Sequence, residues 1–168
     1  MTELESTVRE LVRHVRALED ELAIFRILAF YGPAVDSGSS AEVAELWTED
    51  GVYDAQIGSW SGQSAIAGMV AGPGHQGLIR GGAAHVMGGV PYIVVRGDQA
   101  TATVHYLLHR REDDHFQVWR ATATRWELVR SGDGWKVTRR TNRLLDGSEE
   151  AREFIREGLI EPDHADAE

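Results

Sequence analysis

The spacing of apolar residues changes near residue 85, and this change constrains the fold more than any other feature of the sequence. Before that point apolar side chains recur every three or four residues, which predicts helices. After it they recur every second residue between turn sequences, which predicts antiparallel strands joined by hairpins. We expect helices over 3–31, 41–47 and 63–70, turns at 48–51 and 58–62, and strands over 52–56, 85–96, 99–111, 116–130 and 135–145. This order predicts an α+β fold, with the helices packed against one face of a curved sheet.

The N-terminal helix carries an apolar stripe with the spacing of a coiled coil. Its members recur at alternating intervals of four and three residues: Leu4, Val8, Leu11, Val15, Leu18, Leu22 and Phe25. Such a run is typical of the a and d positions of heptads. Two interpretations stay open: the stripe packs on the rest of its own subunit, or it packs on a helix of another subunit. From Ile24 onward the helix is apolar on several sides, which indicates burial.

Length and charge limit the classes of protein to which the chain can belong. For 168 residues we expect one domain over 1–146, with 1–22 as a helical extension and 147–168 as a C-terminal helix followed by an acidic tail. A formal net charge of −10 argues against nucleic acid and anionic membranes as partners. The acidic N-terminus lacks the pattern of a signal peptide, and the apolar runs are far shorter than the ~20 residues of a membrane span. We therefore expect a cytoplasmic protein.

The sequence predicts neither a metal nor a cofactor. It contains no cysteine, which excludes disulfides, thiolate metal sites and cysteine nucleophiles. It has no H-E-x-x-H or comparable histidine spacing. The glycine-rich segment 71–84 carries neither the phosphate-binding nor the dinucleotide-binding glycine pattern. We expect this segment to be irregular, and long segments of this kind often form a lid or a binding loop.

Alternation along the strands predicts which side chains face the helices. In 99–111 the more apolar set, expected to face inward, is Ala102, Val104, Tyr106, Leu108 and Arg110. His105 and His109 belong to the other face, so this register removes them from the catalytic candidates. In the later strands, the residues that share a face are Thr122, Thr124, Trp126 and Leu128, and then Arg140 and Asn142.

Two polar residues, Asp36 and His85, stand at the ends of apolar segments. Asp36 closes the segment 24–36, and His85 opens the strand-rich half. A carboxylate that holds an imidazole is a general-base device. If the two meet in a pocket, they indicate an enzyme that moves protons on a small organic molecule. Each also has a structural alternative, since Asp36 can cap the break at 37–40 and His85 can be a satisfied core histidine.

The chain resembles the SnoaL-like family of the NTF2-like superfamily over about residues 20–146. The resemblance rests on Ile27-Leu-Ala-Phe-Tyr31 through Asp36, Glu45-Leu-Trp-Thr-Glu-Asp-Gly-Val52, Gly62, Ile66, His85, Gly97-Asp-Gln-Ala100, Asp133-Gly-Trp-Lys-Val137 and Arg139-Arg140. It implies a cone, in which N-terminal helices pack on a strongly curved, mostly antiparallel sheet. It leaves the reaction open, because this fold hosts dehydratases, isomerases, cyclases and non-enzymes.

The resemblance also implies roles for individual residues. The site pattern is similar to that of scytalone dehydratase, the hexachlorocyclohexane dehydrochlorinase and the bile-acid 7α-dehydratase. This implies that His85 is the general base, that Asp36 orients it, and that Tyr31 is a third catalytic residue. Arg140 has the alternative of pairing with an acidic residue on the sheet. The substrate-binding residues expected from the resemblance and the strand faces together are Tyr53, Val104, Tyr106, Leu108, Arg110, Thr124, Trp126, Arg140 and Asn142.

The first functional hypothesis is a cofactor-independent lyase that carries out a dehydratase-type elimination on a small hydrophobic cyclic substrate. An isomerase or cyclase with the same Asp-His pair is the alternative within catalysis. The second hypothesis is a non-catalytic small-molecule-binding or assembly module, in which Asp36 and His85 lie too far apart to bond or side chains fill the cavity. Members of this fold commonly form dimers or trimers, so we expect a homo-oligomer, with a trimer favoured by analogy.

Overall fold

The computed structural model describes residues 2–159, and its first element is one long helix, α1 (Glu3–Ser37). Thr2 and Glu5 form a capping box at its start, in which each side chain accepts a hydrogen bond from the main-chain N–H of the other. Gly38, with a φ of 75°, ends it. The sequence predicted helix over 3–31 and allowed a kinked continuation past Pro33 to Asp36. The helix runs on through Pro33 because the residues around the proline are buried against the sheet, which offsets the lost hydrogen bond.

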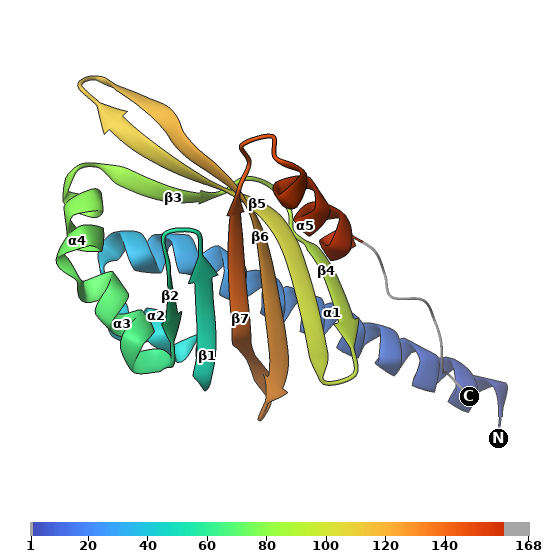
Figure 1. The fold of residues 1–168 in the computed structure, drawn as a ribbon. Helices are drawn as coiled ribbons and strands as arrows, with labels where there is room; N and C mark the ends of the chain where they lie inside the picture. Colours follow the sequence, from blue (N-terminus) through green and yellow to red (C-terminus); the bar gives the residue numbers. More distant parts are fainter. Residues whose placement is uncertain (1, 160–168) are drawn as a thin grey trace.

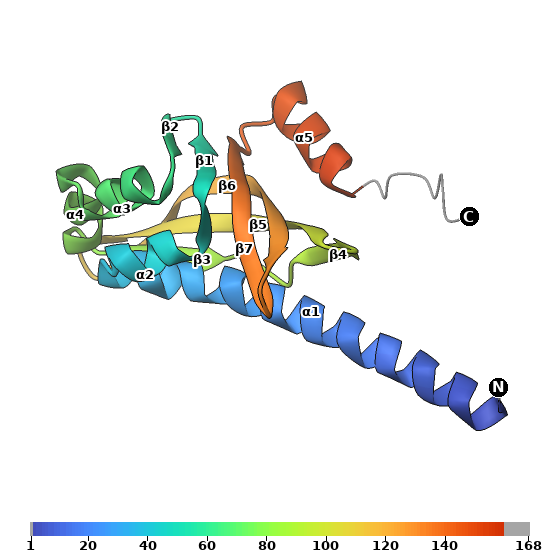
Figure 2. The same cartoon turned by 90° about the horizontal axis from the view of Figure 1, so that it is seen from below.

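The N-terminal half of α1 projects beyond the body of the molecule, and only the C-terminal half lies along the sheet (Figures 1 and 2). Within the part of the chain that the structure describes, the apolar stripe Leu4–Leu22 therefore has no partner, and its members are between 47% and 72% exposed. The stripe therefore does not pack on the rest of its own subunit as far as residue 159. No helix among residues 2–159 is long and apolar enough to cross a membrane.

The sheet follows the order β2-β1-β7-β6-β5-β3, and β4 also pairs with β5. All pairings are antiparallel except that of β1 with β7. The long strands β5, β6 and β7 form the predicted meander. The strands are β1 (Trp47–Ala55), β2 (Gly58–Ser61), β3 (Ala83–Met87), β4 (Tyr92–Arg96), β5 (Gln99–Glu112), β6 (His115–Ser131) and β7 (Gly134–Leu144).

Three short segments differ from the prediction. The expected strand 85–96 is broken into β3 and β4, because Gly88 packs tightly on His105 and Pro91 has no N–H to donate to a ladder. Residues 48–51 belong to β1 rather than to a turn, and the pairing of β1 with β7 shifts register there. Residues 58–61 form the short edge strand β2.

The glycine-rich segment is mostly helical, contrary to the prediction. After α2 (Ser40–Glu45) and β2, the chain forms α3 (Gln63–Ala71) and then α4 (Pro73–Arg80). Pro73 stands in the first turn of α4, where its fixed φ suits a helix and its missing N–H costs nothing. A Cβ at Gly74 or Gly77 would meet nothing within 4 Å, so packing does not require glycine at either position of α4.

The core lies between α1 and the inward face of β5, β6 and β7. Ala102, Val104, Tyr106 and Leu108 are buried as predicted. Arg110 is the exception: it is exposed on the β5–β6 hairpin that extends past the body, with its guanidinium 5.7 Å from the ring centre of Trp119 (Figure 1). Side chains still alternate between the two faces of β5 there, but no helix covers that part of the strand.

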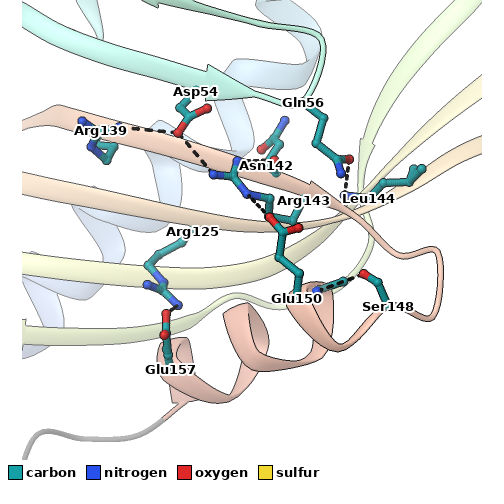
Figure 3. A network of polar contacts seen from close by, with 11 residues as sticks. Asp54, Gln56, Arg125, Arg139, Asn142, Arg143, Leu144, Ser148, Glu150 and Glu157 are labelled. Atoms are coloured by element: carbon teal, nitrogen blue, oxygen red, sulfur yellow. Dashed lines mark hydrogen bonds and ion pairs between the residues drawn. The ribbon is translucent and has the colours of Figure 1, made fainter.

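The last helix, α5 (Glu149–Leu159), packs on the opposite face of the sheet from α1 (Figure 2). Figure 3 shows how arginines of the sheet hold it. Arg143 contacts Asp54 of β1 at 3.3 Å and Glu150 of α5 at 3.5 Å, and Arg125 contacts Glu157 at 3.4 Å. The helix predicted within 147–168 is confirmed by α5, and the acidic tail expected after it lies outside the described residues.

Candidate active site

Asp36 in the last turn of α1 bonds to His85 of β3 through both of its carboxylate oxygens. Oδ1 lies 2.6 Å from the ring Nδ1 of His85, and Oδ2 accepts the main-chain N–H of His85 at 2.8 Å. A carboxylate only accepts, so Nδ1 carries the proton and Nε2 keeps its lone pair. The contact depends on a close approach of helix and strand, because a Cβ at Gly32 would lie 2.6 Å from the carbonyl oxygen of His85.

His85 is held in its neutral form. Burial lowers the pKa of this imidazole, and the nearby charges of Arg140 and His75 act in the same direction. The hydrogen bond and the charge of Asp36 oppose this effect without reversing it. A histidine that is neutral at physiological pH can accept a proton, so the geometry and the protonation state both suit a general base.

A cavity of about 440 Å³ opens beside His85, between α3 and α4 on one side and the sheet on the other. This volume is typical of sites for small organic molecules. Its lining is mainly aromatic and aliphatic, with a few polar groups. The lining residues are Tyr31, Tyr53, Ile57, Trp60, Gly68, Met69, Gly72, Gly74, His75, Leu78, His85, Tyr106, Leu107, Leu108, Arg120, Thr122, Arg140 and Asn142.

Arg140 of β7 lies at the base of this cavity inside a cage of aromatic rings. Its guanidinium carbon is 4.0 Å from the ring centre of Tyr31 and 4.6 to 4.9 Å from those of Trp126, Tyr53 and Tyr106. The residue is 2% exposed, and its Nε and Nη1 have no hydrogen-bond partner. No carboxylate among residues 2–159 forms an ion pair with it, so the predicted alternative of an acidic partner on the sheet is wrong.

A buried cation that is balanced only by ring faces is costly. The charge of Arg140 therefore favours an anion, or negative charge that develops on a bound molecule. Tyr31 beside it is a poor proton donor, because burial raises its pKa strongly and the charge of Arg140 offsets only part of this rise.

Hydrogen bonds fix the direction in which Tyr53 donates. Thr124 donates to the side-chain oxygen of Asn142 at 2.9 Å, and the Asn142 amide nitrogen donates to the hydroxyl oxygen of Tyr53 at 3.0 Å. Since Tyr53 accepts from Asn142, its own proton is free to point toward a bound molecule. Tyr106 differs, because its hydroxyl donates to the carbonyl oxygen of Leu28 at 2.7 Å. Tyr53 is also stacked on Trp60, with ring centres 5.4 Å apart.

The structure separates the predicted substrate-binding residues into three groups. Tyr53, Tyr106, Leu108, Arg140 and Asn142 line the cavity, and so does the predicted catalytic Tyr31. Val104, Thr124 and Trp126 are buried in the core next to it and support the lining residues. Arg110 is on the exposed hairpin and takes no part, so that placement was wrong.

His75 of α4 is the main residue of the cavity that the sequence did not indicate. Its Nε2 lies 2.8 Å from the carbonyl oxygen of Val35, which can only accept, so Nε2 carries the proton. Its ring centre is 5.5 Å from that of His85. The bond ties α4 to α1 and so fixes one wall of the cavity. The predicted outward position of His105 is confirmed by its exposure. His109 does not line the cavity, but it is only partly exposed and its Nε2 is buried.

Comparisons with known proteins agree with this fold. The model of the SnoaL-like domain family matches residues 16–141. An NTF2-like protein with a cystatin-like fold from Novosphingobium aromaticivorans is 39% identical, over 86% of this chain and 94% of that one, with a TM-score of 0.82. No curated protein sequence matches the chain.

Two solved structures with lower sequence identity are similar to this chain in fold only. A Catenulispora acidiphila protein, solved in complex with S-DNPA, is 21% identical over 77% of this chain and 94% of that one, with a TM-score of 0.64. The β subunit of a putative aromatic-ring-hydroxylating dioxygenase from Novosphingobium aromaticivorans is 19% identical over 76% of this chain and 90% of that one, with a TM-score of 0.63. The fold thus occurs in proteins with different tasks, and the task of this chain must be argued from its cavity.

Proposed function

The chain belongs to the SnoaL-like family, and we propose that it is a cofactor-independent lyase that eliminates water from a small hydrophobic cyclic substrate. One observation carries the proposal: Asp36 fixes His85 with both oxygens at the edge of an apolar cavity whose base holds the unpaired cation Arg140. A base, an anion-stabilising group and a hydrophobic enclosure are the parts that such an elimination needs.

In the proposed reaction the substrate carries a carbonyl group and a hydroxyl on the second carbon away from it. Nε2 of His85 takes a proton from the carbon between them, and the C–H electron pair forms an enolate. Asp36 stabilises the imidazolium that results. Tyr53 donates a hydrogen bond to the enolate oxygen, and Arg140 offsets its charge. The enolate then re-forms the carbonyl and a C=C bond, the C–O bond breaks, and the hydroxyl leaves as water with the proton of His85.

The proton balance of this scheme closes on one histidine. His85 is neutral before the reaction, cationic in the middle and neutral again after water has left, so no second acid is required. The depressed pKa of His85 keeps the imidazole neutral and so able to accept a proton at physiological pH, and it makes the imidazolium return that proton readily in the second half. An isomerase shares the first half, and differs in that the proton returns to another carbon of the same molecule.

Product identity tests the proposal. The protein would be incubated with a panel of cyclic β-hydroxy ketones and their β,γ-unsaturated analogues, and the products followed by mass spectrometry and NMR. We expect loss of one water from a hydroxy ketone and no such loss with the His85→Gln variant. Migration of a double bond without loss of water would assign the isomerase instead. Binding of panel members without any turnover would support the binding module and contradict the lyase.

A further inference from the structure

The projecting half of α1 carries a complete apolar seam that no part of residues 2–159 covers. Assigned to heptads, its a positions are Val8, Val15 and Leu22, and its d positions are Leu4, Leu11, Leu18 and Phe25. The six residues from Leu4 to Leu22 are each at least 47% exposed. Most helical stability in proteins comes from packing of an apolar face. The seam therefore lacks the partner that its pattern requires.

The seam points away from the body of its own chain. Asp20, at an f position, faces the body: it accepts two hydrogen bonds from the guanidinium of Arg130, both at 2.8 Å, and one from Trp135 at 3.0 Å. Ile24 and Leu28, at c and g, are fully buried. Leu22, at a, is 47% exposed on the other side. A second helix can thus lie along the seam without displacing anything that holds α1 to the sheet.

We propose that the α1 seam of a second copy of this chain covers this one, as a parallel, in-register two-stranded coiled coil. Two features of the sequence favour this occupant. Valine at a together with leucine at d is the combination that favours two parallel strands. The flanking g and e positions also match, because a parallel pair sets Glu21 beside Arg26 of its partner and His14 beside Glu19.

The antiparallel alternative fits less well. If the same seam is aligned in the opposite direction, with Leu4 opposite Leu22, Glu5 comes beside Glu19 of the partner helix. Like charges at such positions oppose pairing. The parallel arrangement also places both bodies at the same end of the coiled coil, where each keeps its own cavity. The proposal concerns assembly and does not depend on the reaction carried out in that cavity.

Sedimentation of the full chain tests the proposal. We expect a dimer at micromolar concentration, and a monomer for the double variant Leu11→Glu and Leu18→Glu. Both positions are exposed and outside the body, so the variant should keep the circular dichroism and thermal transition of the folded domain. Ala17→Glu is the matched control, because it adds the same charge to an exposed c position of the same helix, and it should remain a dimer. A monomeric or trimeric wild type, or a dimer that survives the double substitution, would overturn the proposal.

Cysteine cross-linking tests the direction of the helices, since the chain contains no native cysteine. Leu4→Cys places two thiols side by side only in a parallel, in-register pair. We expect it to form a disulfide-linked dimer on mild oxidation, whereas Ala17→Cys on the outer face stays monomeric under denaturing conditions. Equal cross-linking of the two variants, or none at Leu4→Cys, would contradict the parallel arrangement.

Discussion

Asp36 bonds to His85 twice, once at the ring and once at the main chain, and these two contacts connect the end of α1 to the middle of β3. The ring contact fixes the tautomer, and the main-chain contact fixes the position of the carboxylate. A merely structural cap at the end of α1 would require neither. The pair therefore links the fold to the proposed chemistry.

The Asp36→Asn substitution keeps the size of the side chain and removes its charge. We expect kcat to fall by ~10²-fold or more, because the imidazolium formed during proton transfer loses its counter-charge and the tautomer is no longer fixed. The pKa of His85 should fall further, since the group that opposes the effect of burial is gone. The acid limb of the kcat/KM profile should therefore move to lower pH. A limb that moves to higher pH would contradict this role of Asp36.

His85 should also make stability depend on pH. Its pKa in the folded chain lies below the ordinary value of 6.5, so above that pH both states are neutral and the histidine contributes no pH dependence. As the pH falls below 6.5 the unfolded chain binds the proton first, and the free energy of unfolding decreases until the folded pKa is passed. Chemical denaturation of wild type and His85→Gln between neutral and mildly acidic pH measures this. The variant should lose less stability over that range, and parallel curves would argue against the depressed pKa.

Replacing Arg140 by methionine separates stability from function. Because the guanidinium is buried without an anionic partner, its removal should leave the melting temperature unchanged or higher, despite the loss of contacts with four aromatic rings. Turnover should fall by ~10²-fold or more, as expected when a group that stabilises developing charge is lost. Arg139→Met is the control, since Arg139 contacts Asp54 at 3.7 Å and does not line the cavity. A large loss of stability in Arg140→Met would mean that the cation is structural.

The two tyrosines Tyr53 and Tyr106 make a matched pair. Both line the cavity, but only the hydroxyl proton of Tyr53 is free. Tyr53→Phe should lower kcat by ~10²-fold, the effect of losing one donor to a developing oxyanion. Tyr106→Phe should leave kcat nearly unchanged and cost ~1 kcal/mol of stability through its lost hydrogen bond. The opposite pattern of rates would reverse the assignment of the donor.

Much of the fold and of the proposed site follows from local patterns in the sequence. Apolar periodicity identified α1, the meander β5–β7 and the buried face of β5, because period and burial are coupled in regular elements. Alternation places Leu108 and Arg110 on the same face of β5, but it does not show how far along the strand that face is covered. Leu108 is buried as predicted, whereas Arg110 is exposed because no helix packs over that end of the strand.

The remaining parts of the site depend on contacts between distant segments. His75 stands among glycines that predict an irregular segment, and it belongs to the cavity because α4 packs near the end of α1. The hydrogen bond to the Val35 carbonyl that holds His75 joins two segments far apart in the sequence, so no local sequence pattern predicts it. The cage around Arg140 likewise joins rings from α1, β1, β5 and β6, whose common position is set by strand pairing rather than by spacing along the chain.

The proposed function depends on proton abstraction by His85, and exchange of substrate hydrogen with D₂O measures this step whatever the later fate of the enolate. NMR of a bound cyclic ketone should show deuterium entering the carbon next to the carbonyl with wild type. With His85→Gln exchange should be slower by about 10²-fold or more, while the control His105→Gln, altered at an exposed histidine, exchanges like wild type. Equal exchange by His85→Gln and wild type would contradict the account.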